Sequence, residues 1–221
     1  MNKANIKNIE TWRLATILVT LLILSAPKLH AQSTGQLYAL GFNMGLASFQ
    51  ASVVAGTTDP NMGWSALDEV SRALFTAEKL ARDMNSSSFP SGELDHWLKY
   101  ALQWHNFRPE FREAYQTLYN TIVSARDGYT AQLAKSGRSD LVHAYVLGVN
   151  IGIAEGQATV GDAARQIVYS SLINARLEAQ ALGLDLNPLN ECIYLANTTT
   201  PMREVYAKIV SLRSIYQSSL R

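Results

Sequence analysis

Apolar residues recur every three or four positions along most of the chain, with polar residues between them, as in amphipathic helices. Clusters of Gly, Pro, Asn, Asp and Ser interrupt this pattern and mark turns. The pattern predicts helices over residues 36–55, 65–84, 93–104, 109–134, 139–158, 162–182 and from 201 onward, with a short one around 189–196. We therefore expect an all-α protein of about seven or eight helices.

Capping residues set the expected helix starts. A side-chain oxygen at the N-cap accepts a hydrogen bond from a free backbone N–H of the first turn. On this basis Ser65 opens the second helix, and Ser139 or Asp140 opens the helix that ends at residue 158. Thr200 caps the last helix, with Pro201 at the favoured first position.

Residues 38–51 are nearly copied at residues 145–158. Eight residues are identical at a constant spacing of 107, namely Tyr38, Leu40, Gly41, Asn43, Gly45, Ala47, Gln50 and Ala51 in the first copy. Self-similarity at one fixed spacing is typical of duplicated structural units. The sequence therefore predicts that one multi-helix unit was duplicated.

Weaker similarities extend this prediction. Residues 83–85 resemble 185–187 at a spacing of 102, and residues 112–115 resemble 203–206 at a spacing of 91. Deletions in the second copy would shorten the spacing in this way. We expect two helical repeats, 32–135 and 139–221, packed as one globular unit about a pseudo-twofold axis.

Glycines are frequent in the repeated helix, although each costs about 1 kcal/mol relative to alanine in a helix interior. At 100° per residue these glycines lie on one face of their helix. A close crossing of the two copies would offset the cost, because backbones without side chains between them can touch. We expect that crossing to run through Gly41, Gly45, Gly148 and Gly152.

The repeated helices also carry four amides at matching positions, Asn43, Gln50, Asn150 and Gln157. A buried polar group without a partner costs about 1–3 kcal/mol. Two interpretations stay open: hydrogen bonds that fix the helix register, or a polar cavity that holds a ligand. Glu155 lies beside this polar patch and is the first candidate for chemistry, unless it faces solvent at the helix end.

The first 31 residues have the features of a secretory signal peptide. Three basic residues precede an uncharged run at 14–26, and Ala31 ends a tolerable cleavage site. The run of 13 residues is short for a membrane span, which needs about 20. Small residues spaced by four also occur in packed membrane helices, but polar residues such as Asn43 and Glu155 are costly in lipid. We therefore expect a soluble protein after cleavage, periplasmic or secreted.

Charge and cysteine content narrow the possible functions. From residue 32 onward the chain has 15 basic and 17 acidic residues, so it lacks the basic surface that nucleic acid requires. Cys192 is the single cysteine, which excludes an internal disulfide and makes it most simply a buried apolar residue. Export without disulfides favours a bacterial protein.

No catalytic, metal-binding or cofactor motif accompanies the repeats. His96, His105 and His143 lack the duplicated Glu-x-x-His pattern of helical di-metal sites, so neither a metal nor a cofactor is expected. The leading hypothesis is a non-enzymatic binding or interaction module of the bacterial cell envelope, with a small molecule or an envelope protein as its partner. The alternative is a hydrolase-like envelope enzyme in which Glu155 or His143 is the acid/base and the amides orient the substrate.

Overall fold

Seven α-helices account for most of the described chain, and none of the described residues forms a strand. The computed structural model describes residues 33–86, 89–92, 95–96, 99 and 108–220. The helices are α2 (Thr34–Gly56), α3 (Pro60–Asp83), α5 (Arg112–Lys135), α6 (Ser139–Ala158), α7 (Arg165–Ala181), α8 (Asn187–Ala196) and α9 (Met202–Ser219). The all-α prediction is confirmed. The predicted signal peptide and most of the predicted helix at 93–104 lie outside the described residues.

The first two described helices begin at residues that satisfy free backbone groups. Ser33 and Gln36 form a capping box at α2, in which each side chain bonds the other residue's backbone N–H. α3 starts at Pro60, because the Asp59 carboxylate accepts a hydrogen bond from the backbone N–H two residues later, at 2.9 Å. The predicted start at Ser65 is therefore wrong by more than one turn.

The predicted caps at Ser139, Asp140 and Thr200 are also wrong. α6 and α9 begin without any side-chain cap. The Asp140 carboxylate instead binds the Arg138 guanidinium at 2.6 Å. The Thr200 hydroxyl lies 2.8 Å from the hydroxyl of Thr198 and is hydrogen-bonded to it. In both cases the side-chain oxygen is bonded to a neighbouring side chain.

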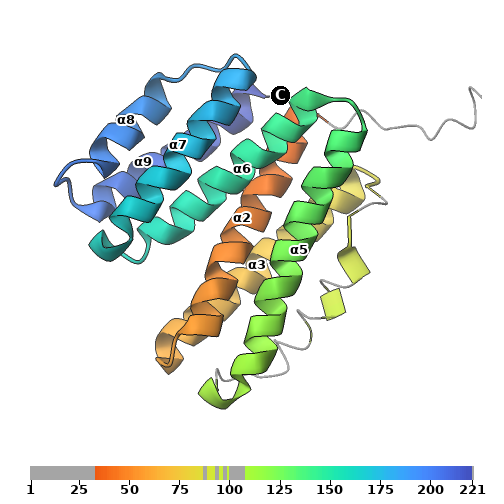
Figure 1. Ribbon diagram of the computed structural model, residues 1–221, viewed down its shortest axis with the longest axis vertical. Coiled ribbons are helices and arrows are strands. Elements are labelled where there is room, and N and C mark those ends of the chain that lie inside the picture. The colour runs from red at the N-terminus through yellow and green to blue at the C-terminus, as the bar shows by residue number, and fades with distance from the viewer. Residues whose placement is uncertain (1–32, 87–88, 93–94, 97–98, 100–107, 221) are drawn as a thin grey trace, which may run out of the picture. The chain divides into compact units, whose positions relative to one another are not determined.

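α2 and α6 cross at the centre of the fold with their backbones in contact (Figure 1). A Cβ atom added to Gly41 would lie 2.0 Å from the carbonyl oxygen of Tyr145. A Cβ atom added to Gly148 would likewise lie 2.0 Å from the carbonyl oxygen of Tyr38. The two contacts are reciprocal, because residue 41 corresponds to 148 and residue 38 to 145 at the spacing of 107.

The next turn of each helix repeats the same contact. A Cβ atom on Gly45 would lie 2.1 Å from the Val149 carbonyl oxygen, and one on Gly152 would lie 2.1 Å from the Phe42 carbonyl oxygen. No side chain fits in these spaces without separating the helices. The structure thus places a backbone of the partner helix against each of the four glycines named from the sequence.

Two clusters of buried apolar residues lie on either side of this crossing. The first is built mainly from α2, α3 and α5, and α6 adds Leu141, Tyr145 and Val149 to it. The second is built from α6, α7, α8 and α9, and α2 adds Tyr38 and Phe42 to it. Because α2 and α6 serve both clusters, they are apolar on most of their circumference.

Buried positions recur between the outer helices at constant spacings. Ala66, Val70, Ala73 and Ala77 of α3 match Val168, Leu172, Ala175 and Ala179 of α7 at the predicted spacing of 102. Leu118, Ile122 and Tyr129 of α5 match Val205, Ile209 and Tyr216 of α9 at a spacing of 87. The predicted spacing of 91 would pair Tyr115, which is 2% exposed, with Tyr206, which is 36% exposed, so that pairing does not describe the packing.

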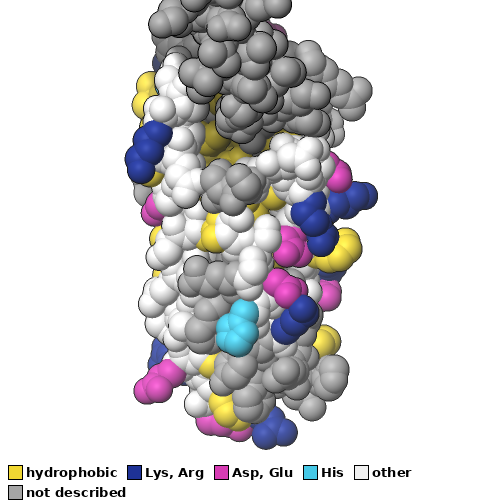
Figure 2. Space-filling model, turned by 90° about the vertical axis from the view of Figure 1, so that its right-hand side faces the viewer, with side chains coloured by type: hydrophobic (Ala, Val, Ile, Leu, Met, Phe, Trp, Pro, Cys, Tyr) yellow, Lys and Arg dark blue, Asp and Glu magenta, His cyan; other side chains and the backbone are white. Residues whose placement is uncertain are grey.

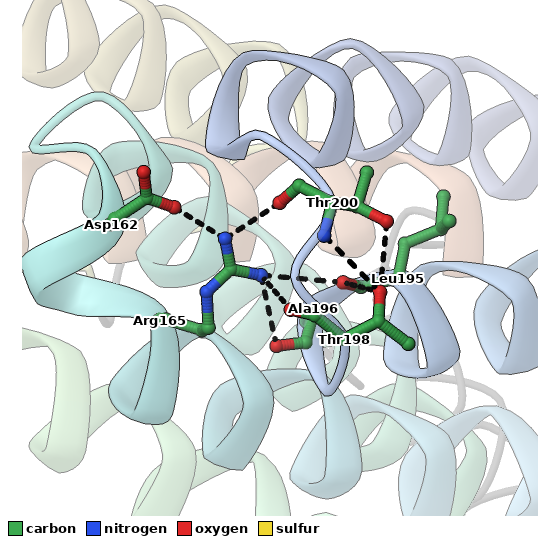
Figure 3. A network of polar contacts seen from close by, with 6 residues as sticks. All are labelled: Asp162, Arg165, Leu195, Ala196, Thr198 and Thr200. Atoms are coloured by element: carbon green, nitrogen blue, oxygen red, sulfur yellow. Dashed lines mark hydrogen bonds and ion pairs between the residues drawn. The ribbon is translucent and has the colours of Figure 1, made fainter.

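The connection between α8 and α9 is held by one arginine at the start of α7 (Figure 3). The Arg165 guanidinium forms an ion pair with Asp162 and donates hydrogen bonds to the backbone carbonyls of Leu195, Ala196, Thr198 and Thr200. Carbonyls at a helix C-terminus lack partners within their own helix. Arg165 therefore fixes the end of α8 and the chain that follows.

The described surface carries charges of both signs. On the face in Figure 2, Lys and Arg side chains lie among Asp and Glu side chains. Several are paired directly, as in the 2.6 Å contact between Lys208 and Glu191. This described face therefore presents no continuous field of one sign.

The crossing predicts a large difference between two glycine-to-alanine variants. Gly45→Ala should lower the free energy of unfolding by more than about 2 kcal/mol, because the added methyl group forces the two backbones apart. Gly128→Ala is the control, since it lies in α5 and a Cβ there meets nothing within 4 Å. It should raise stability by up to about 1 kcal/mol. Urea unfolding measures both, and similar values for the two variants would contradict the crossing.

Candidate functional site

The structure separates the two predicted asparagines. Each is half-buried and donates its side-chain N–H to the carbonyl four residues earlier in its own helix, Asn43 at 2.8 Å and Asn150 at 3.0 Å. Asn43 lines a cavity of about 360 Å³ beside Arg213, and Asn150 lines one of about 330 Å³ beside Arg126. Each side-chain amide is thus bonded within its own helix, and the two asparagines do not bond each other.

The two glutamines differ although both are 7% exposed. The Gln157 side-chain oxygen accepts a hydrogen bond from the Ser171 hydroxyl at 3.0 Å. The Gln50 side chain makes no hydrogen bond to any described residue, and it lines a third cavity together with Glu155. The predicted patch is therefore not one surface: the structure brings only Gln50 and Glu155 to the same cavity.

This cavity, which we call the Glu155 pocket, has a volume of about 400 Å³ and lies among α2, α3, the end of α6 and α9. Its apolar lining is Leu46, Val53, Met62, Ala66 and Val160. Its polar lining is Gln50, Ser65, Glu69, Glu155, Thr159 and Tyr206. A cavity that combines apolar lining with converging polar groups can serve as a small-molecule site.

Glu155 is the most unusual side chain of the pocket. It is only 6% exposed, and no other charged residue lies between Ala144 and Gly161. One carboxylate oxygen accepts a hydrogen bond from Arg213 at 3.2 Å, and the other is buried without a partner. Burial raises the pKa of Glu155, the Arg213 charge opposes this rise, and the Glu69 charge adds to it.

Arg213 and Tyr38 complete the buried polar cluster around Glu155. The Arg213 guanidinium lies 5.0 Å from the centre of the Phe42 ring, a cation–π contact, while 38% of its side chain stays exposed. The Tyr38 hydroxyl is buried without a hydrogen-bond partner. Burial raises the pKa of Tyr38, and the nearby Glu155 charge raises it further. Two unsatisfied polar atoms thus lie close to one ion pair.

Sequence reasoning did not single out Arg213 or Tyr38 for this role. One signal was present: Glu155 stands alone in an otherwise uncharged helix, and a buried charge needs a counter-charge. The sequence does not say which arginine supplies it. Glu155 itself does not face solvent at its helix end, because α9 covers that turn with Arg213.

His143 lies elsewhere. Its Nδ1 is 2.7 Å from the Glu178 carboxylate, and both side chains are partly exposed. It stands twelve residues before Glu155 on α6, which is about 18 Å along the helix. The two candidate acid/base groups therefore cannot act on one substrate atom.

Metal and thiol chemistry find little support in the described part of the chain. No group of three or more His, Cys, Asp or Glu side chains that could hold a metal ion occurs among the described residues. Cys192 is buried, as predicted, and burial raises the pKa of its thiol to about 12. A thiol with so high a pKa is a poor nucleophile at neutral pH.

Comparison with other proteins adds no relative to this geometry. No protein-family model matches the chain, and no curated protein or solved structure is significantly similar to it. The function is therefore inferred from the site itself.

The two glutamines give a matched test of which amides are structural. Gln157→Leu should lower stability by about 1–3 kcal/mol, because it leaves the buried Ser171 hydroxyl without its acceptor. Gln50→Leu should be neutral or stabilising, because it removes an amide that has no partner. Chemical denaturation of both variants measures this. Equal losses at both positions would mean that Gln50 has a structural partner.

The Arg213 ion pair gives a pH-dependent prediction. Arg213→Met should lower the free energy of unfolding at pH 7 by about 1–3 kcal/mol, because it leaves the buried Glu155 carboxylate without its counter-charge. This range allows for the solvent that partly screens the exposed Arg213 charge. The raised pKa means that the folded protein holds a proton on Glu155 at pH values where the unfolded chain has lost it. Protonated Glu155 needs no counter-charge, so the cost should shrink near pH 4, close to the ordinary glutamate pKa.

Arg176→Met, an exposed position on α7, is the control for that measurement. It should change stability little at either pH. A cost of Arg213→Met that is the same at both pH values would contradict the ionic role and point to lost packing on Phe42.

Proposed function

We propose that this protein is an exported, soluble binding module of the bacterial cell envelope, built from two related helical units, and that the Glu155 pocket is its ligand site. The module has no catalytic role. Its partner is a small molecule that enters the pocket.

The packing supports the proposal of two related units. The contacts of Gly41, Gly45, Gly148 and Gly152 in the α2–α6 crossing are reciprocal at a spacing of 107. Tyr38 and Phe42 of α2 enter the second apolar cluster, and Tyr145 and Val149 of α6 enter the first. Such reciprocity is what a twofold relation between two like surfaces produces.

The same relation extends to the flanking cavities. Asn43 lies beside Arg213 of α9, and Asn150 lies beside Arg126 of α5. The two arginines correspond at the spacing of 87 that relates the buried residues of α5 and α9. The two units then differ at position 155, where the second copy has glutamate and the first has Ser48, which bonds its own helix. The Glu155 pocket is a departure from this symmetry.

One observation carries the binding proposal: Glu155, which is only 6% exposed, lines the pocket and keeps one carboxylate oxygen without a hydrogen-bond partner. Buried polar groups are nearly always paired in folded proteins. Groups kept unpaired at a cost to stability are common at functional sites, where a ligand supplies the missing partner. A purely architectural pocket has no need of a buried glutamate.

Binding is better supported than hydrolysis. A hydrolase needs a nucleophile or bound water held beside a base that a third group orients. Within the described chain, neither Ser65 nor Tyr206 is hydrogen-bonded to Glu155, and Arg213 holds the carboxylate from the other side. The imidazole of His143 already bonds Glu178 outside the pocket.

The soluble state is proposed for the chain after cleavage at Ala31. Among the described residues, only α2 is long and apolar enough to cross a membrane by length and composition. The most apolar stretch of α2 is 67% buried, and the core helix of a soluble protein can have the same length and composition. Its glycines contact α6, so lipid is not required to cover them.

Export is tested by processing. Expressed with its leader in a Gram-negative bacterium, the protein should appear in the periplasmic extract with the intact mass of a chain that begins at Gln32. Replacing Lys3 and Lys7 with glutamate should leave full-length protein in the cytoplasm, because the positive n-region is lost. Correctly processed protein that remains in carbonate-washed membranes would contradict the soluble state.

Ligand binding is tested by filling the pocket. Native mass spectrometry of protein purified from its own host should detect a copurified small molecule. Ser65→Trp should remove it, because the indole occupies the cavity from an exposed position on α3. Ser170→Trp, at an exposed position on α7, is the matched control and should retain the molecule. A molecule retained by both variants would place the site elsewhere.

A further inference from the structure

We infer that the Glu155 pocket binds a small organic amine in its protonated form, with the ammonium group held between Glu155 and Glu69 and the carbon body held against the apolar wall. This inference rests on the proposed binding function and adds the class of ligand.

The charged residues that line the pocket are all acidic. Two carboxylates, Glu69 and Glu155, line the pocket, and no Lys, Arg or His does. Arg213 reaches Glu155 from the neighbouring cavity that it shares with Asn43. Arg72 binds Glu69 at 3.0 Å but is not part of the lining. A ligand in the pocket therefore meets acidic groups directly and meets their counter-charges only behind them.

The pocket lining includes a hydrogen-bond acceptor that has no donor. Glu155 leaves one buried carboxylate oxygen without a donor. A carboxylate can only accept hydrogen bonds, so its missing partner must be a donor. An alkylammonium group offers three N–H donors and a positive charge, and charge-assisted hydrogen bonds are about twice as strong as neutral ones.

Apolar side chains also line the pocket. Leu46, Val53 and Ala66 line the pocket, together with Val160 in the chain that follows α6. At about 400 Å³ the cavity lies at the small end of ligand sites. An amine with a compact hydrocarbon body fits both the polar and the apolar lining. An anion of the same size would face two carboxylates and is disfavoured.

The test compares three probes that share one ring: cyclohexylamine, cyclohexanol and cyclohexanecarboxylate. Isothermal titration of the mature chain at pH 7 should show the amine binding about tenfold more tightly than the alcohol, the effect of one charge-assisted hydrogen bond. The carboxylate should not bind. Glu155→Gln and Glu69→Gln should each weaken amine binding by about tenfold and leave the alcohol unchanged. Glu113→Gln, exposed on α5, is the control and should change nothing.

The outcomes separate this inference from the proposed function. If the alcohol or the carboxylate binds as well as the amine and Ser65→Trp abolishes that binding, the amine inference is wrong and the pocket remains the ligand site. A copurified ligand without an amine group has the same meaning. If no probe binds and no ligand copurifies, both proposals fail.

Discussion

The backbone contact between α2 and α6 is the constraint on which the rest of this structure depends. At four positions a single methyl group would meet a carbonyl oxygen of the other helix at 2.0 to 2.1 Å. Because the two backbones touch, the larger side chains of both helices must point to either side of the contact. Those side chains enter the two apolar clusters, in which α3, α5, α7, α8 and α9 pack against them. Glycines that weaken the isolated helices are therefore what lets the pair form.

The same contact explains why an acidic residue can stay buried. Glu155 follows Gly152 by less than one turn, so the position of its Cα is set by the crossing and cannot move toward solvent. α9 packs over this end of α6, and Arg213 supplies the counter-charge at 3.2 Å. The arginine is held in turn by the face of the Phe42 ring. Packing thus fixes a charge in a place where electrostatics alone would not leave it.

Two polar clusters show the difference between structural and functional use of charge. Arg165 donates hydrogen bonds to four carbonyls, forms an ion pair with one carboxylate, and caps the end of a helix (Figure 3). Glu155 keeps one carboxylate oxygen free beside a cavity. In the first arrangement both terminal nitrogens of the guanidinium have partners within the folded chain. The second lacks a donor, and this missing donor is the physical basis for proposing that a ligand enters there.

The sequence by itself determined the helical class, the burial of Cys192 and the four glycines of the central pair, because periodicity and residue size act locally. It misplaced the start of α3 and the cap of α9, because a cap depends on which of several nearby oxygens is free. It also grouped four amides that the structure separates. Only the tertiary structure decided that Glu155 meets Arg213, 58 residues later, since that pairing depends on how α9 rotates against α6. A pocket formed by residues from several helices exists only once those helices have packed.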